Sequence, residues 1–167
     1  MYSLIKNFFY KDPFEKEKNQ MSRQVLQATL NAVASKDNKI DNVFIFIPQT
    51  GSITMHSKVS GFAGQPKIES FMGWMNRLSG IENALSQTGY GDLNYATFPM
   101  KDAIITLFFL NEGFAEDIIV GFVCEQTGNA ETALGEHVYN AKKFMDGYRD
   151  RGGKPIEGIK DMLKNIF

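Results

Sequence analysis

The sequence contains 167 residues, of which 43% are hydrophobic and 22% are charged. This length fits one domain with short extensions and is sufficient for a hydrophobic core without disulfides or metals. The net charge of -1 argues against nucleic acid as a partner, and the single cysteine excludes an internal disulfide and CxxC metal or redox chemistry. No apolar run reaches the roughly 18 residues of a membrane span, so we expect no stable membrane insertion and a cytoplasmic location.

Residues 1–20 are predicted to form an N-terminal extension. Their apolar side chains recur at helical spacing over the first ten residues, which predicts an amphipathic turn or two that Pro13 ends. This segment either packs on the domain or docks on a partner or membrane surface. The first helix of the domain is predicted from Met21 to Ser35, because its apolar residues fall on one face.

Two strands joined by a tight turn follow. Residues 43–47 form a short apolar run rich in β-branched and aromatic side chains, which predicts a strand buried on both faces. Residues 52–59 alternate polar and apolar side chains, which indicates a half-exposed strand. Gly51 supplies the positive φ that the connecting turn needs, so the two strands are predicted to form a hairpin.

Residues 67–87 are predicted to form a second helix with a wide apolar face. Pro66 fits its first turn. Gly73 and Gly80 lie inside it at a cost of about 1 kcal/mol each relative to Ala, which is typical where another element approaches closely. Trp74 lies off the main stripe, so the apolar face is wide enough for burial on two sides.

Residues 92–100 are predicted to form an edge strand, because Pro99 cannot donate a ladder hydrogen bond. Alternation places Leu93, Tyr95 and Thr97 on one face. The second helix either contributes only to the core or also forms a dimer interface, since Trp, Met and Phe are enriched at interfaces and an edge strand offers unpaired backbone groups. The predicted interface residues are Phe71, Trp74, Met75, Leu78, Leu93, Tyr95 and Thr97.

The remaining pattern predicts two central strands, residues 103–110 and 118–125, and a long amphipathic helix. That helix starts near Ala130, carries an apolar stripe through Tyr148, and is ended by Gly152 and Gly153. The tail from residue 156 has helical spacing and either packs on the domain or docks on a partner. These features predict a domain over residues 21–150 and an amphipathic tail over residues 151–167.

No residues form a catalytic motif, and no cofactor or metal is expected. His56 and His137 lack a second ligand at a metal-binding spacing, so both are interpreted as structural or surface residues. Cys124 is interpreted as an inert core residue, since a thiol nucleophile needs a base that the sequence does not identify. Gly61 and Gly64 precede a helix but lack the remainder of a phosphate-binding motif. An enzyme site around Cys124 or His137 stays the least favoured hypothesis.

With this element order, the sequence resembles the roadblock / dynein light chain family over about residues 21–149. The strand of residues 43–47 with Gly51 is similar to the first strand and Gly-bearing turn of that family. Gly91 lies where the family often has a Gly before its third strand. Residues 119–123, a polar loop and Leu134-Gly135 are similar to its final strand, loop and helix. The turn at Gly51 lacks the usual Asp-Gly, and the loop of residues 60–66 is long.

The resemblance implies an α+β fold in which a five-stranded antiparallel sheet lies between helices in the order α-β-β-α-β-β-β-α. It implies a homodimer, or a heterodimer with a similar chain, paired through residues 67–87 and 92–100. It also implies a non-enzymatic regulator or scaffold that binds a small Ras-like GTPase or assembles a larger complex. The alternative is a PAS- or profilin-like module that senses a small ligand in a pocket near the central strands.

Overall fold

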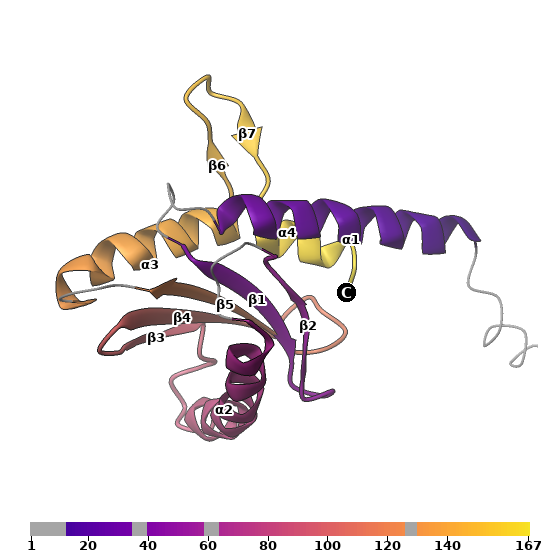
Figure 1. Cartoon of the computed structure of the whole chain (residues 1–167). Helices are drawn as coiled ribbons and strands as arrows, with labels where there is room; N and C mark the ends of the chain where they lie inside the picture. The colour runs from indigo at the N-terminus through magenta and orange to yellow at the C-terminus, as the bar shows by residue number, and fades with distance from the viewer. Residues whose placement is uncertain (1–12, 35–39, 59–63, 126–129) are drawn as a thin grey trace, which may run out of the picture.

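The computed structural model describes residues 13–34, 40–58, 64–125 and 130–167. Its centre is a five-stranded antiparallel sheet in the order β2-β1-β5-β4-β3 (Figure 1). The strands are β1 (Asn42–Ile47), β2 (Ser52–His56), β3 (Tyr95–Pro99), β4 (Ala103–Leu110) and β5 (Ile118–Glu125). The predicted amphipathic turn in residues 1–10 lies outside the described residues. Of the loop predicted over residues 60–66, residues 60–63 also lie outside them, and residues 64–66 belong to a helix instead.

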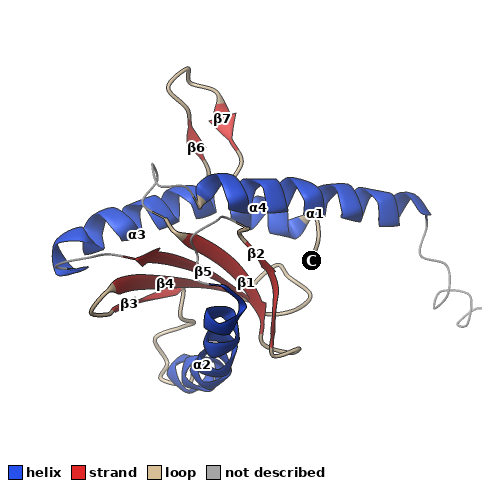
Figure 2. Ribbon diagram, in the orientation of Figure 1, coloured by secondary structure: helices blue, strands red, loops and turns tan. Residues whose placement is uncertain are grey.

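Helices cover both faces of the sheet. The helices are α1 (Pro13–Val33), α2 (Gly64–Ser86), α3 (Ala130–Asp146) and α4 (Ile159–Lys164). Figure 2 shows α1, α3 and α4 on one face and, among the described helices, α2 alone on the other. The predicted α+β fold, with its sheet between helices and its element order, is confirmed. Within the described part of the chain, no helix is both long and apolar enough to span a membrane.

Two hydrophobic layers follow from the alternation of side chains along the buried strands. Odd-numbered residues of β1, such as Val43 and Ile45, point toward α1, α3 and α4, whereas Phe44 and Phe46 point toward α2. All six residues of β1 are buried, as expected for a strand with helices on both sides. The two layers therefore share one sheet but have different helical covers.

The turn between β1 and β2 has the geometry that its glycine predicts. Gly51 has φ 64°, and its N–H donates to the carbonyl oxygen of Ile47 over 3.0 Å. A register shift between Ile45 and Phe46 interrupts the alternation of β2, which the sequence pattern did not reveal. The predicted hairpin is confirmed with this irregularity.

Helix α1 begins at Pro13, so the expected start at Met21 is wrong. Proline is well suited to the first position of a helix, because its missing N–H has no intrahelical partner there. The charged residues that follow Pro13 are good helix formers, and none of them interrupts the helix. The predicted boundary at residue 20 therefore falls inside a continuous helix.

Helix α3 ends at Asp146, so the expected continuation through Tyr148 is wrong. Gly147 adopts φ 88° and its N–H donates to the carbonyl oxygen of Lys143 over 3.0 Å, which is a common way for a helix to end. The chain then forms a short hairpin of β6 (Tyr148–Arg149) and β7 (Pro155–Ile156), which was not predicted.

The C-terminal tail packs back on the domain, which is one of the two roles expected for it. Ile159 and Leu163 of α4 are fully buried in the same hydrophobic cluster as α1 and α3. The Asn19 side chain of α1 donates to the carbonyl oxygen of Ile166 over 3.3 Å, and the Arg23 guanidinium lies 5.2 Å from the centre of the Phe167 ring. The last residues thus hold the middle of α1 against the body of the domain.

Candidate interaction surface

The inner side of α2 anchors this helix to the sheet. Met75 is fully buried and Leu78 is 8% exposed, and both pack in the cluster with Phe44 and Phe46. These two helix positions lie three residues apart, so they face the same side of the helix. The described residues of α2 therefore have a defined core-facing side.

A buried carboxylate lies on the same inner side of α2. The side chain of Glu82 is 6% exposed, and it accepts a hydrogen bond of 3.0 Å from the Asn111 side chain, which follows β4. A buried polar group costs free energy unless it is paired, so this bond fixes the C-terminal half of α2 relative to the end of β4.

The flank of α2 that adjoins Leu78 leaves large apolar residues in contact with solvent. Ile81 is 54% exposed and Leu85 is 45% exposed. They lie four residues apart and continue a stripe from Trp74, which is half-buried. The Trp74 ring packs edge-on against Phe98 of β3, with 5.1 Å between ring centres. We name Trp74, Ile81, Leu85 and Phe98 the α2–β3 surface.

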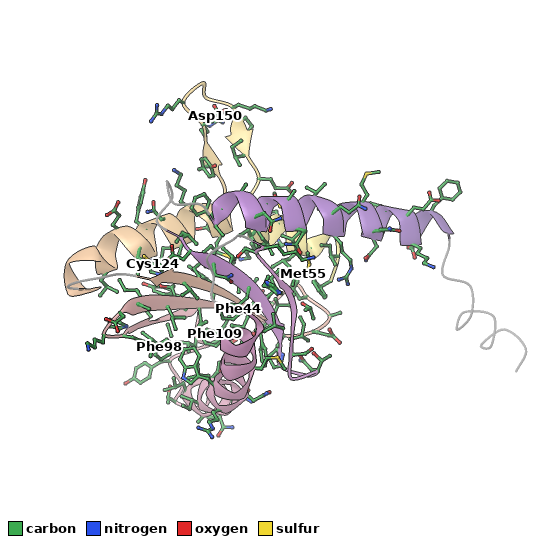
Figure 3. The ribbon with its side chains drawn as sticks, in the orientation of Figure 1. Phe44, Met55, Phe98, Phe109, Cys124 and Asp150 are labelled. Atoms are coloured by element: carbon green, nitrogen blue, oxygen red, sulfur yellow. The ribbon has the colours of Figure 1, made fainter. Side chains whose placement is uncertain are left out.

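Strand β3 lies at one edge of the sheet, next to this surface. Its inner side pairs with β4, and no other strand of the described residues pairs with its outer side. Figure 3 places Phe98 on this part of the sheet, with Phe44 and Phe109 nearer its centre. An edge strand presents unpaired backbone N–H and C=O groups to any chain that approaches it.

The predicted interface residues separate into groups. Met75 and Leu78 belong to the core of this chain, and Trp74 borders solvent. The side chain of Phe71 lies outside the described residues.

The predicted common face of Leu93, Tyr95 and Thr97 is wrong. Leu93 precedes β3, which starts at Tyr95. Its side chain packs against the hydrophobic layer between the sheet and α2. Tyr95 and Thr97 point to the α3 side: the Tyr95 ring lies 4.3 Å from the ammonium of Lys142, and the Thr97 hydroxyl lies 3.2 Å from that of Thr106. Strand alternation did not extend to Leu93, because that residue lies outside the paired strand.

The sequence pattern identified the stripe of α2 but not its exposed half. Ile81 and Leu85 are apolar positions of the same stripe, and only their exposure distinguishes them from Met75 and Leu78. A signal was present in the width of the apolar stripe, which exceeds what one contact with a sheet can cover. Phe98 is absent from the predicted interface residues, because strand alternation places it opposite Tyr95 and Thr97, yet its ring contacts Trp74.

The titratable and nucleophilic candidates occupy structural positions. His137 is 3% exposed, and burial lowers its pKa from 6.5 to about 4. Neither ring nitrogen of His137 has a hydrogen-bond partner among the described residues. Cys124 is a buried thiol in β5, and His56 Nδ1 lies 2.9 Å from the Ser57 carbonyl oxygen. Within the described ranges, no three His, Cys, Asp or Glu residues gather as a metal site would require.

Comparisons with known proteins identify the fold. No protein-family model matches the sequence, and a search of curated proteins finds no relative. Among solved structures, Myxococcus xanthus MglB superposes with a TM-score of 0.55 at 12% identity, covering 85% of this chain and 94% of that chain. A structure described as MglB with tetrameric arrangement has a TM-score of 0.50 at 13% identity, covering 75% of this chain and 83% of that chain. The chain has a roadblock-like fold.

A Roadblock/LC7 domain from Streptomyces avermitilis is more distant, with a TM-score of 0.40 at 10% identity over 71% of this chain and 90% of that chain. At these identities the likeness concerns the fold alone. The residues that contact other molecules therefore have to be inferred from the exposed side chains of this chain. The α2–β3 surface is the candidate that the geometry supports best.

Proposed function

We propose that this chain is a non-enzymatic, dimeric roadblock-like protein that binds a small Ras-like GTPase or assembles a larger complex. The observation that supports this proposal most strongly is the α2–β3 surface, where exposed apolar side chains border an open strand edge. The family resemblance of the sequence implies pairing through the same two segments.

A two-fold dimer would use both features of this surface at once. In a two-fold dimer the same patch of both copies meets, so β3 can pair antiparallel with β3 of the partner while α2 packs against α2. Full burial of a large aliphatic side chain contributes about 1.5–3 kcal/mol, so Ile81 and Leu85 from two copies supply a substantial apolar contact. One similar structure is described as having a tetrameric arrangement, which supports self-association for this fold.

The GTPase part of the proposal rests on the family resemblance. A GTPase partner requires a surface that remains accessible in the dimer, and it implies a cytoplasmic location, where GTP is available. A partner chain of similar sequence in place of a second copy is the heterodimeric form of the same proposal. The same surface serves both forms.

The ligand-sensing alternative finds no support at the centre of the sheet. Gly121 of β5 faces Phe44 of β1, and a Cβ atom on Gly121 would overlap the Phe44 ring. The ring therefore fills this part of the α2-side layer, and Val120 and Phe122 beside it are fully buried toward the other helices. We therefore retain the dimeric regulator or scaffold as the proposed function.

Size-exclusion chromatography with light scattering tests self-association. We expect a dimer at high micromolar concentration, and we expect Ile81→Asp with Leu85→Asp to produce a folded monomer. Met75→Asp is unsuitable as a test, because it would place a charge at a fully buried position and unfold the chain. The matched control is Met21→Asp with Val25→Asp on α1, an exposed apolar pair with the same four-residue spacing.

The control pair should leave the dimer intact. A strictly monomeric wild type would overturn the dimer, and loss of assembly in both double variants would show that the α2–β3 surface is not the specific contact. A pull-down with the nucleotide state controlled then tests GTPase binding. If no GTPase is retained in either the GDP or the GTP-analogue state, the regulator form of the proposal fails. The scaffold form then requires that other proteins are retained by the wild type and lost with the Ile81→Asp and Leu85→Asp double variant.

A further inference from the structure

The hairpin of β6 and β7 projects from the layer formed by α1, α3 and α4 (Figure 1). Its two ends cross at a pair of glycines. A Cβ atom on Gly147 would lie 2.7 Å from the carbonyl oxygen of Ile156, and one on Gly158 would overlap the backbone at the end of α3. This close backbone crossing fixes the direction in which the hairpin leaves the domain.

The tip of the hairpin is braced internally by Asp150, which Figure 3 labels. One carboxylate oxygen of Asp150 accepts hydrogen bonds from the N–H groups of Gly152 over 2.9 Å and Lys154 over 2.8 Å. The Arg149 guanidinium donates to the carbonyl oxygen of Gly153 over 2.9 Å. A carboxylate that accepts two backbone N–H groups is committed to the turn, so the tip has a defined shape before any partner arrives.

An open groove of about 550 Å³ lies between this hairpin and the C-terminal half of α3. Three cations line it, namely Lys142, Lys143 and Arg149, and its other lining residues are Tyr139, Tyr148, Gly147 and Asp146. Among these described lining residues Asp146 is the one carboxylate, so the groove carries two net positive charges. Tyr139 is 69% exposed and presents a ring and a hydroxyl group to the groove.

The lysine ammonium groups are positioned by aromatic rings, which leave their charge unneutralised. Lys142 Nζ lies 4.3 Å from the centre of the Tyr95 ring, and Lys143 Nζ lies 4.5 Å from that of Tyr148. Cation–π contacts hold an ammonium in place but supply no counter-charge. Within the described residues, none of the groove cations forms an ion pair.

We propose that this groove binds a phosphate monoester group, carried by a soluble molecule or by a lipid headgroup. A phosphate monoester has a charge of about -1.5 to -2 at pH 7 and three acceptor oxygens, which matches two net positive charges and donors from three side chains. A single carboxylate has one charge and two oxygens, so it would leave part of the groove unpaired. An extended acidic protein segment is the competing ligand.

The groove is separate from the α2–β3 surface. Figure 2 shows the hairpin on the side of α1, α3 and α4, whereas α2 lies across the sheet. The hairpin end of the groove therefore lies away from a dimer contact through α2, whereas its Lys142 end adjoins Tyr95 of the edge strand β3. This inference does not depend on the proposed dimer or on its GTPase partner.

The test is a nuclear magnetic resonance titration of the full chain with glycerol phosphate, together with co-sedimentation with phosphatidylcholine vesicles that contain phosphatidic acid. The two probes present the same phosphate monoester from the two sources. We expect shifts at the amides around Lys142 and Arg149, and Lys142→Gln or Arg149→Gln should weaken binding by about tenfold or more, because each removes a charge-assisted hydrogen bond.

The matched control is Lys154→Gln, which makes the same charge change on the same hairpin but outside the groove lining. It should change binding by less than about threefold, since only the long-range field is altered. Binding of glycerol phosphate supports a site for soluble ligands, and binding of the phosphatidic acid vesicles alone supports a lipid source. Lys142→Gln and Lys154→Gln should keep the melting temperature of the wild type. Arg149→Gln also removes the bond to the Gly153 carbonyl oxygen, so its melting temperature is measured to separate lost binding from a loosened hairpin.

Three results would overturn the proposal. Absence of binding to both probes removes it. Equal loss in Lys154→Gln, or equal binding to vesicles of the phosphodiester lipid phosphatidylglycerol, would show general electrostatic adsorption in place of a phosphate site. Tighter binding of a glutamate-rich peptide than of either phosphate probe, lost in Lys142→Gln, would assign the groove to an acidic protein segment.

Discussion

The two faces of the sheet differ in how completely the chain covers them. On one face, α1, α3 and α4 enclose a layer that includes the fully buried residues Leu26, Ile159 and Leu163. On the other face α2 is the single helix of the described residues, and one flank of it leaves Ile81 and Leu85 in solvent. The first face has the features of a stability core, and the second retains apolar surface that a partner can cover. The strands are common to both, so they join the core to the surface proposed for association.

The difference between the two faces is tested most directly by replacing one leucine on each face with alanine. Leu163→Ala should destabilise the chain by about 3 kcal/mol, because removal of a fully buried leucine side chain costs about 2–5 kcal/mol through lost burial and a cavity. Leu85→Ala on the exposed flank of α2 should cost less than about 1 kcal/mol, since this side chain is 45% exposed. Urea denaturation at a protein concentration low enough to keep the chain monomeric measures both values.

If the two substitutions cost the same, the faces do not differ as described. A small effect of Leu163→Ala alone would mean that α4 contributes little to the core. A large effect of Leu85→Ala that appears only at high protein concentration would instead locate Leu85 in an interface, because association stabilises the folded state by mass action.

The second prediction concerns the point where the α2-side layer is most tightly packed. Gly121→Ala should destabilise the chain by about 2–3 kcal/mol, because the new Cβ atom would overlap the buried Phe44 ring. Phe44→Leu should recover part of this loss when combined with Gly121→Ala, since the smaller side chain leaves room for the methyl group. A double-mutant cycle followed by denaturation gives the coupling between the two positions. Independent, additive effects would show that the ring and the glycine do not form this contact.

The sheet and its helical layers were predictable because their residues follow strong periodic patterns. The run from Val43 to Ile47 identified a strand buried on both faces, and the central strands read in the same way. Gly51 was identifiable as a turn residue, since the turn requires positive φ. The apolar runs and the turn glycine are local signals, because each can be recognised from the residue types of one short segment.

The candidate surface was predictable only in outline. The edge position of β3 followed from Pro99, and the wide stripe of α2 followed from its spacing. Which residues of that stripe face the sheet depends on the tertiary rotation of α2, and spacing alone does not fix it. The hairpin after α3 escaped prediction because Gly147 ends the helix inside an amphipathic pattern that continues to Tyr148. Its basic groove depends on the crossing of Gly147 and Gly158 at the two ends of the hairpin, a contact that no periodic pattern indicates.

The smallest expected effect concerns His137 of α3, on the face covered by three helices. Its side chain is buried without hydrogen-bond partners among the described residues. Burial lowers the pKa of His137 from 6.5 to about 4. Between these values the unfolded chain binds a proton at this side chain and the folded chain does not, so stability falls as the pH decreases from about 6.5 toward 4. At pH 7 both states are neutral there, and this contribution is absent.

His137→Leu tests this account, because leucine has a similar volume and no ionisable group. The variant should gain about 1 kcal/mol at pH 7, since two unpaired buried nitrogens are removed. It should also lose the part of the acid dependence that arises from His137, which is at most about 1.4 kcal/mol for each pH unit below 6.5. Urea denaturation of wild type and variant at pH 7, 6 and 5 measures the difference in slope. Parallel pH profiles for the two proteins would contradict this account. They would mean that His137 contacts water or a polar group in the folded state, on the face covered by α1, α3 and α4.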